Sequence, residues 1–306
     1  MKRTFGWGGE PLSRIGISVN KGKPKARVVA RQLVWLIEER GAEVFLEPDI
    51  AAEMDRPELG LPLDQFPERV DMVFVLGGDG TLLGIARHFA KSRVPILGFN
   101  LGHLGFLSEA EPDSLASAVE RVLAGDYIVE ERMMLDAEVI RDGRVMETSI
   151  ALNDVGIAKG SFSRMITCTV SMDGAYLGTY SGDGLIVSTP TGSTAYSLSC
   201  GGPIMWPGLQ TLLLTPICPH TLTARPMVLP PDGTLEIRVS STHRDIGLTI
   251  DGQLGYRLEV DDIIRVSRSS SVTFLIKWKE RSFFEVVRKK LQGNGGEDGG
   301  WEDKGS

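Results

Sequence analysis

Residues 72–81 read Met-Val-Phe-Val-Leu-Gly-Gly-Asp-Gly-Thr. The apolar run predicts a buried strand, and the three glycines around Asp79 predict a tight turn that leads into a helix. Glycine has no Cβ, so such a turn can lie directly against a phosphate, and the helix start offers unpaired N–H groups to an anion. Asp79 is then a candidate metal ligand or proton acceptor, while the same residue is also suited to cap the helix. The turn alone leaves the two interpretations equally open.

The composition is that of an ordinary globular protein. The chain has 306 residues, 42% hydrophobic and 24% charged, which is enough for two domains. Its net charge of −7 does not favour nucleic acid or an anionic membrane as a partner, and we expect neither. The three cysteines lack disulfide or zinc-site spacing, and no signal peptide or apolar membrane span is visible. We therefore expect a cytoplasmic protein.

The first 130 or so residues alternate between strand and helix patterns. Strands are expected at 14–20, 42–48, 71–76 and 95–100, and helices at 25–40, 81–90 and 113–123. Short apolar strands separated by amphipathic helices favour a Rossmann-like parallel sheet with helices on its faces. Ligands bind such sheets at the carboxyl ends of the strands, where Gly77 to Thr81 lies.

Near Arg132 the pattern changes to one strand after another. Asp142-Gly143 and Asp173-Gly174 each separate two alternating runs and predict hairpin turns. Further strands are expected at 184–188, 234–240, 247–250, 263–267 and 272–278, and a helix at 282–291. These patterns favour an all-β, sandwich-like second domain.

The patterns imply four parts. We expect an α/β domain, an all-β domain, a C-terminal helix that can pack back on the first domain, and a disordered glycine-rich tail. Their expected bounds are 1–131, 132–280, 281–292 and 293–306.

Three further segments place polar residues where a ligand can bind. Residues 182–203 run from a strand into a Pro-Thr-Gly turn and a helix start, with more hydroxyl-bearing residues than a capped turn requires. Residues 100–107 form a second glycine loop, in which His103 is expected to be structural rather than catalytic. Asn153-Asp154 interrupts an apolar run, and alone it favours a β-bulge over a ligand contact.

Together these segments resemble the NAD kinase family. The likeness rests on Gly77-Gly-Asp-Gly-Thr81, Asn100 to Phe106, Asn153-Asp154, Asp183 to Ser199 and Asp251-Gly-Gln253, in this order. Diacylglycerol and sphingosine kinases and phosphofructokinases carry similar Gly-Gly-Asp-Gly elements, whereas the Thr-Pro-Thr-Gly-Ser-Thr-Ala-Tyr stretch is highly specific. The resemblance covers roughly Arg14 to Arg288.

The resemblance implies transfer of the γ-phosphoryl group of ATP to the 2′-hydroxyl of the adenosine ribose of NAD, giving NADP. It implies Asp79 as the catalytic base. The implied phosphate loop contains Gly77, Gly78 and Thr81, and the implied substrate contacts are Gly80, Phe106, Asn153, Asp154, Arg164, Asp183, Thr194, Ala195, Tyr196, Ser199 and Gln253. In this scheme Asn153 and Asp154 bind the adenosine portion, Arg164 lies near phosphate and Asp183 lies near the nicotinamide end.

One position departs from the family. Some bacterial members carry arginine two positions before the equivalent of Asp183, where this chain has Ser181. The chain therefore lacks one charged substrate contact of those relatives.

The implied cofactor is a divalent metal ion, Mg²⁺ carried with ATP, and no protein residue is assigned as its ligand. No Walker lysine pattern is present, so Lys159 or Arg164 is a candidate to share the triphosphate charge with the metal and with backbone N–H groups. A homodimer or homotetramer is expected. A lipid kinase built on the same glycine motif and a non-catalytic NAD-binding sensor remain the alternatives. Polyphosphate as donor, NADH as acceptor and inhibition by NADPH stay open.

Overall fold

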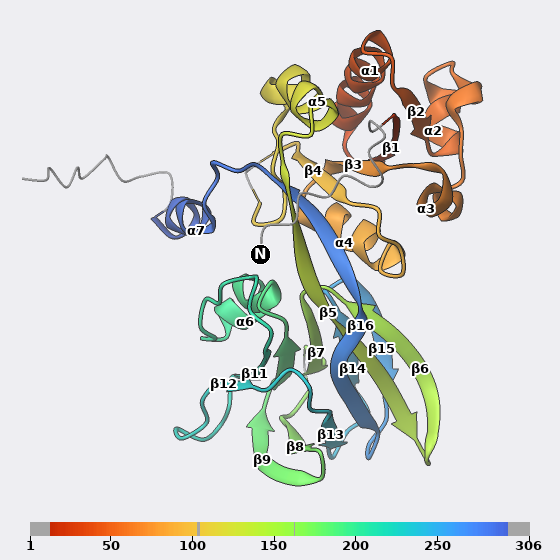
Figure 1. Ribbon diagram of the computed structural model, residues 1–306. Coiled ribbons are helices and arrows are strands. Elements are labelled where there is room, and N and C mark those ends of the chain that lie inside the picture. Colours follow the sequence, from red (N-terminus) through yellow and green to blue (C-terminus); the bar gives the residue numbers. More distant parts are fainter. Residues whose placement is uncertain (1–12, 103–104, 162, 293–306) are drawn as a thin grey trace, which may run out of the picture.

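The computed structural model describes residues 13–102, 105–161 and 163–292 (Figure 1). Two β-sheets run through it, a ten-stranded mixed sheet and a six-stranded antiparallel sheet. Most helices gather around one end of the larger sheet, and the smaller sheet lies toward the other end (Figure 1). His103 and the tail 293–306 fall outside the described residues.

The first half of the chain forms the parallel part of the larger sheet, in the order β2-β1-β3-β4. Its strands are β1 (Arg14–Val19), β2 (Glu43–Leu46), β3 (Met72–Gly77) and β4 (Ile96–Asn100). The helices are α1 (Pro24–Glu39), α2 (Pro48–Glu53), α3 (Phe66–Arg69), α4 (Asp79–His88) and α5 (Leu115–Leu123), with the 3₁₀ turns η1 (Pro57–Leu59), η2 (Leu63–Gln65) and η3 (Pro112–Ser114). The predicted α/β part is confirmed.

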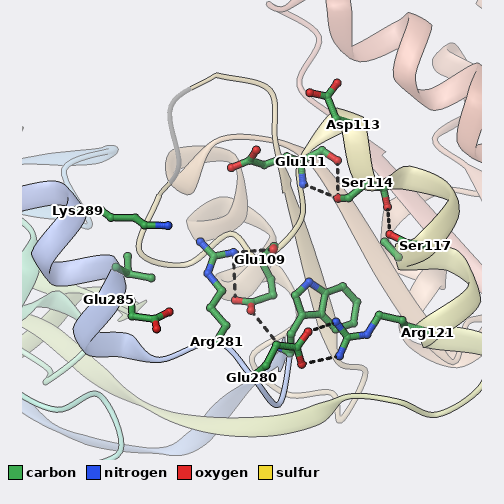
Figure 2. Close-up of a pocket in the computed structure, with 13 residues that line it drawn as sticks. Glu109, Glu111, Asp113, Ser114, Ser117, Arg121, Glu280, Arg281, Glu285 and Lys289 are labelled. Atoms are coloured by element: carbon green, nitrogen blue, oxygen red, sulfur yellow. Dashed lines mark hydrogen bonds and ion pairs between the residues drawn. The ribbon is translucent and has the colours of Figure 1, made fainter. Parts of the chain in front are cut away.

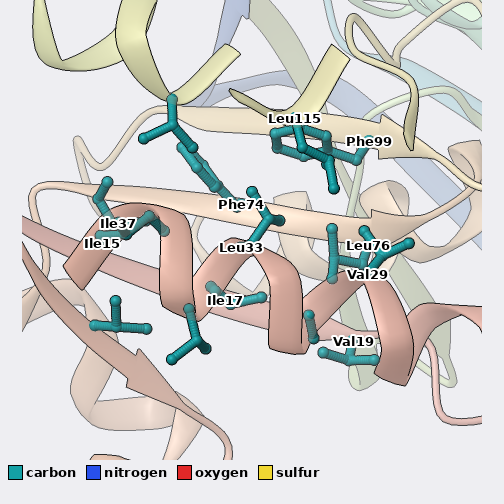
Figure 3. Close-up of a cluster of buried hydrophobic side chains, with 14 of the residues drawn as sticks. Ile15, Ile17, Val19, Val29, Leu33, Ile37, Phe74, Leu76, Phe99 and Leu115 are labelled. Carbon is teal, nitrogen blue, oxygen red and sulfur yellow. The ribbon is translucent and has the colours of Figure 1, made fainter. Parts of the chain in front are cut away.

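Helices cover both faces of this parallel sheet, which explains why β3 is apolar at every position. Phe74 packs with α1 and α5 on one face, through residues such as Leu33 and Leu115 (Figure 3). Val73 and Val75 point to the other face and pack with residues of α3 and α4. A strand buried on both sides has no solvent-facing position, so it shows no alternation.

The helix after the glycine turn begins earlier than predicted. The sequence pattern placed its start at Thr81, but α4 begins at Asp79 with Gly78 as its N-cap. The capping interpretation of Asp79 is also wrong, since Gly78 occupies the cap position and makes no side-chain cap bond. The Asp79 carboxylate is therefore available for other contacts.

The second half of the chain is built from strands of both sheets. They are β5 (Ile128–Arg141), β6 (Arg144–Ala151), β7 (Asp154–Lys159), β8 (Ile166–Met172), β9 (Ala175–Gly182), β10 (Gly184–Ser188), β11 (Leu212–Ile217), β12 (Met227–Leu229), β13 (Leu235–Ser240), β14 (Ile246–Ile250), β15 (Leu254–Leu258) and β16 (Ile263–Lys277). The six-stranded sheet has the order β12-β11-β10-β7-β14-β15. One apolar core contains residues of both sheets, such as Val139 and Val170 with Val187 and Leu248. The expected sandwich-like packing is confirmed.

Both predicted Asp-Gly hairpins are present. Asp142 and Gly143 have φ of 49° and 75° between β5 and β6, and Asp173 and Gly174 have φ of 51° and 81° between β8 and β9. Positive φ at both central positions matches the right-handed twist of the strands.

Two long strands connect the halves of the molecule (Figure 1). β16 is one strand with a register shift between Arg268 and Val272, where the sequence predicted two strands separated by a gap. Its end pairs with β4 through Leu275 and Ile96, and β5 begins at Ile128, before the change of pattern at Arg132. We keep the division into domains at 131/132 as a proposal, with β5 and β16 shared by both parts.

The Asn153-Asp154 pair is not a bulge. β6 ends at Ala151 and β7 begins at Asp154, so Asn153 lies in the short connection between these strands, and Asp154 pairs in regular register with Ser188 of β10. The apolar residues on either side belong to different strands, which the sequence pattern did not separate.

The last helix is α7 (Phe283–Gln292). Val286 is buried and lines a cavity with residues of α5, and the Phe283 ring lies 5.5 Å from the Trp206 ring, centroid to centroid. Packing of this helix on the first domain stays a proposal. Within the described ranges, we find no helix with the length and apolar character needed to cross a membrane.

Candidate active site

Three loops meet at the carboxyl ends of β1, β3 and β4. They are residues 20–23 after β1, the turn at Gly77 and Gly78 that leads into α4, and the described residues 101–102 and 105–108 after β4. Asn20 Nδ2 donates to Thr81 Oγ1 at 2.8 Å, and Leu101 N donates to the carbonyl oxygen of Gly77 at 2.9 Å. A Cβ on Gly77 would overlap with the Thr81 side chain, so the close turn requires glycine there. The predicted phosphate loop is thus tied to both neighbouring loops.

The second glycine loop is folded around the Asp79 carboxylate. Oδ2 of Asp79 accepts from the N–H of Phe106 at 2.8 Å, and Oδ1 accepts from Ser108 Oγ at 2.9 Å and from Ser108 N at 3.3 Å. A Cβ on Gly105 would overlap with the Asp79 carboxylate. The backbone of this loop therefore holds the carboxylate in one orientation and brings Phe106 beside it.

A buried ion pair anchors the same loop from β16. Glu109, whose side chain is 1% exposed, accepts from Lys277 Nζ at 2.8 Å and from Trp278 N at 3.1 Å. Burial lowers the pKa of the Lys277 ammonium, and the charge of Glu109 opposes that shift. Lys277 Nζ also donates to the carbonyl oxygen of Leu107 at 3.4 Å, so the end of β16 fixes the loop that holds Asp79.

A hydrogen-bonded clasp joins α4 to the turn between β14 and β15. Gln253 Nε2 donates to the carbonyl oxygen of Gly80 at 2.6 Å, and Gln253 Oε1 accepts from Arg87 Nη2 at 2.6 Å. Arg87 Nη1 also forms a 2.6 Å ion pair with Asp251. Gly80 and Gln253 were both predicted as site residues. They lie 173 positions apart in the sequence and are in direct contact.

Asp251 extends this clasp to the Asn153-Asp154 pair. Its side chain has no exposed surface, and its Oδ1 accepts from Asn153 N at 2.7 Å and from Asp154 N at 3.1 Å. Asp251 itself has φ of 52°, in the turn between β14 and β15. Sequence reasoning named the Asp-Gly-Gln turn but did not assign Asp251 or Arg87 to the site.

Asp154 is buried next to this charge. Burial, and after it the negative charge of Asp251, raise the pKa of the Asp154 carboxyl to about 7. The neutral acid is thus the favoured form of Asp154 in the folded protein below that pH.

We expect Asp154→Asn to stabilise the protein more at pH 8 than at pH 5. The folded-state pKa of Asp154 lies above its unfolded value of about 3.9, so its contribution to stability falls as the pH rises from about 4 to about 7. Asparagine does not titrate, so the stability of the variant does not fall with pH through this position. Thermal unfolding of both proteins across this range provides the measurement, with the exposed Asp64→Asn as control. A difference in Tm that stays constant with pH would contradict the assignment.

The Thr-Pro-Thr-Gly turn packs against the same pair. Thr189 Oγ1 donates to the carbonyl oxygen of Leu152 at 2.6 Å, and Thr189 N donates to that of Asn153 at 2.9 Å. A Cβ on Gly192 would overlap with the Asn153 backbone. The turn continues into η4 (Gly192–Thr194) and α6 (Tyr196–Ser199), which places the predicted Thr194, Ala195, Tyr196 and Ser199 directly after it.

Asp183 lies at the opposite end of β10 from this pair. Ser188 pairs with Asp154 and Gly184 pairs with Ala158, so β10 spans the distance between the two predicted contacts. Asp183 Oδ1 lies 3.7 Å from Lys159 Nζ. Lys159 lies five positions along β7 from Asp154, a distance of about 17 Å.

Arg164 and Ser181 belong to this distant end. Arg164 is exposed, and its carbonyl oxygen accepts from His243 Nε2 at 2.7 Å. Ser181 Oγ lies 3.0 Å from Thr167 Oγ1. Lys159 and Arg164 therefore lie at the Asp183 end of β10 and not at its Asp154 end.

A cavity of about 540 Å³ lies between α7 and the segment around η3 and α5, and Glu109, which anchors the loop that holds Asp79, is among the residues that line it (Figure 2). Its labelled side chains are mainly charged, including Glu111, Arg121, Glu285 and Lys289. None of the predicted site residues that the structure describes lines it.

A glycine turn at the carboxyl ends of parallel strands, a carboxylate inside that turn and a second sheet that contacts it are features of a nucleotide-binding site and suit a phosphotransferase. Comparison with known proteins agrees. The ATP-NAD kinase N-terminal domain model matches residues 15–127, and the ATP-NAD kinase C-terminal domain model matches residues 152–278. The chain belongs to the ATP-NAD kinase family.

Similar proteins support this membership over nearly the whole chain. The NAD kinase of Moorella thermoacetica is 45% identical over 284 residues, which cover 93% of this chain and 91% of that protein. The NAD kinase of Heliobacterium modesticaldum is 46% identical, over 92% of this chain and 99% of that protein.

Two solved structures share the fold. Yeast NADH kinase complexed with NADH has a TM-score of 0.86 at 28% identity, covering 94% of this chain and 90% of that one. An NAD kinase from Archaeoglobus fulgidus in complex with ATP has a TM-score of 0.69 at 21% identity, over 92% of this chain and 98% of that one.

Proposed function

We propose that this chain transfers the γ-phosphoryl group of ATP to the 2′-hydroxyl of the adenosine ribose of NAD and so forms NADP. The observation that carries this proposal is the Asp79 carboxylate, held by the loop 105–108 inside a glycine turn that also contacts the second sheet through Gly80 and Gln253. The names of the similar proteins support the same reaction.

In this proposal Asp79 accepts the proton of the ribose hydroxyl as that oxygen attacks phosphorus. Phosphoryl transfer asks the protein mainly to position two reactants and to stabilise charge, and the carboxylate adds proton transfer. Gly77, Gly78 and Thr81 are proposed to lie against the donor phosphates at the start of α4. The Thr81 N–H itself donates to the Gly78 carbonyl oxygen at 3.0 Å, so Thr81 would offer its side chain. The hydrogen bonds that fix the Asp79 carboxylate support this role, because an acceptor that is already oriented pays less entropy to reach the geometry for proton transfer.

NAD is proposed to bind along β10, from the Asn153-Asp154 pair toward Asp183. The adenosine portion would contact Asn153, Asp154 and the η4–α6 segment with Thr194, Ala195, Tyr196 and Ser199. Phe106, Gly80 and Gln253 would complete the pocket beside Asp79, with the nicotinamide end at Asp183 and Arg164 near phosphate. The close packing of the Thr-Pro-Thr-Gly turn on Asn153 supports a single continuous surface.

The divalent ion is proposed to be Mg²⁺, bound mainly by triphosphate oxygens. Within the described residues no group of three or more His, Cys, Asp or Glu side chains is placed to hold a metal ion, and Asp79 offers one carboxylate at the turn. That donor set fits an ion carried by ATP, and Mg²⁺ when bound would neutralise phosphate charge.

We also propose that the protein forms a homodimer or homotetramer and that it is located in the cytoplasm.

A single assay tests the function. Purified protein is incubated with NAD, ATP and Mg²⁺, and the product is scored with a strictly NADP-dependent reductase. In parallel reactions, polyphosphate replaces ATP to test the donor, and NADH replaces NAD to test the acceptor. A third reaction contains added NADPH to test for inhibition. We expect NADP to form. Absence of product with every donor would favour an NAD-binding sensor, and transfer to a lipid hydroxyl alone would favour a lipid kinase.

A further inference from the structure

Lys23 lies beside the glycine turn, although no sequence pattern indicated it. Its Nζ is 3.9 Å from the position that a Cβ would take on Gly78 and 4.0 Å from the corresponding position on Gly102. Gly78 is the N-cap of α4, immediately before Asp79, and Gly102 belongs to the loop after β4. One ammonium group therefore lies next to both glycine loops.

The Lys23 ammonium has no hydrogen bond or ion pair within the described part of the chain. The neighbouring Lys21 is paired with Glu47 at 3.0 Å and with Asp49 at 2.7 Å. Lys23 is the N-cap residue of α1, but its side chain makes no cap bond. Its side chain can therefore be changed without removing a contact that starts the helix.

Asn20 holds the segment that carries Lys23. Its Nδ2 donates to Thr81 Oγ1 at 2.8 Å, its Oδ1 accepts from Gly22 N at 3.0 Å, and its carbonyl oxygen accepts from Lys23 N at 3.1 Å. The loop after β1 is thus attached to the first turn of α4, which makes the position of Lys23 a property of the fold.

Other cations near the turn are already engaged. Arg87 is paired with Asp251, and Lys277 is paired with the buried Glu109. In a chain with a net charge of −7, binding a triphosphate needs a local positive group, and Lys23 meets that need at the turn.

We propose that Lys23 binds the terminal phosphates of the phosphoryl donor, as part of a site for a triphosphate or polyphosphate anion. This inference rests on the proposed function. The glycine turn has two sides: Gly80 meets the second sheet through Gln253, whereas Gly78 meets Lys23 from the side of β1. NAD is proposed to bind on the side of the second sheet, so Lys23 faces the donor.

The test compares Lys23→Met with Lys25→Met and Lys23→Arg. Lys25 is exposed on the first turn of α1, so its replacement removes the same charge two residues away. Steady-state kinetics give the KM for ATP and for NAD, and titration calorimetry gives the Kd of tripolyphosphate. We expect Lys23→Met to raise both the KM for ATP and the Kd of tripolyphosphate by at least about tenfold, with the KM for NAD within about twofold. Lys23→Arg should retain most of the affinity.

Two outcomes overturn the proposal. Lys23→Met could match Lys25→Met in both measurements, or it could raise the KM for NAD and leave both donor measurements unchanged. If the parent protein makes no NADP, the proposed function fails, and the tripolyphosphate titration still decides whether Lys23 binds the anion.

Discussion

Asp79→Asn is expected to lower kcat by about 10²–10⁴ while NAD still binds. Asparagine has the shape of aspartate but cannot accept the ribose proton. Both carboxylate oxygens accept hydrogen bonds, Oδ2 from Phe106 N and Oδ1 from Ser108 N and Oγ, so the asparagine amide keeps an acceptor on one side only and its NH₂ group faces a donor on the other. Stopped assays for NADP give kcat, and calorimetry with NAD gives the Kd.

A control separates the loss of the base from a disturbed loop. Ser108→Ala removes one hydrogen bond to Asp79 and leaves the carboxylate in place. We expect it to lower kcat far less than Asp79→Asn does. Near-normal turnover of Asp79→Asn would show that another group accepts the proton.

Arg87→Met is expected to lower the free energy of unfolding by about 3–5 kcal/mol. Arg87 is 12% exposed and Asp251 is fully buried, so the variant leaves a carboxylate without its cation inside the protein. Three neutral backbone N–H groups then remain to stabilise the charge, that of Leu152 at Oδ2 and those of Asn153 and Asp154 at Oδ1. Denaturant unfolding monitored by fluorescence measures the change.

The same variant should impair the reaction, since Arg87 also holds Gln253 against Gly80. The matched control is Arg27→Met, which breaks the solvent-exposed pair with Glu53 and should change stability far less than Arg87→Met does. Adding Asp251→Asn to Arg87→Met removes the uncompensated charge and should restore part of the stability. Equal effects of Arg87→Met and Arg27→Met would argue against a buried clasp.

Sequence patterns predicted the local elements well where a strand, a glycine turn and a helix follow one another. β10 was predicted at 184–188 and found there, and the two Asp-Gly hairpins form as expected. Patterns failed where the signal is short or interrupted. β11 contains Pro216, β12 has three residues, and β15 was not separated from the turn before it, so none of these strands was predicted.

The site residues likewise fall into two groups, those that a local sequence motif indicates and those that it does not. Gly77 to Thr81 stand together in the sequence and carry their own chemical signal, and the specific Thr-Pro-Thr-Gly stretch identified the family from the residues alone. Lys23 sits in an ordinary Lys-rich loop, and Arg87 is an ordinary polar residue of an amphipathic helix. Nothing in their neighbours along the chain distinguishes them.

The sequence by itself determined the strand–turn–helix around Asp79, the α/β class of the first half, the all-β class of the second half, and the family. It could do so because local periodicity and glycine chemistry act over a few residues. Only the tertiary structure decided what Asp79 contacts and which residues join the two halves. Asp79 meets Ser108 across 29 positions, and Arg87 meets Asp251 across 164. Such contacts depend on how β5 and β16 extend from one half into the other, and no local pattern encodes that path.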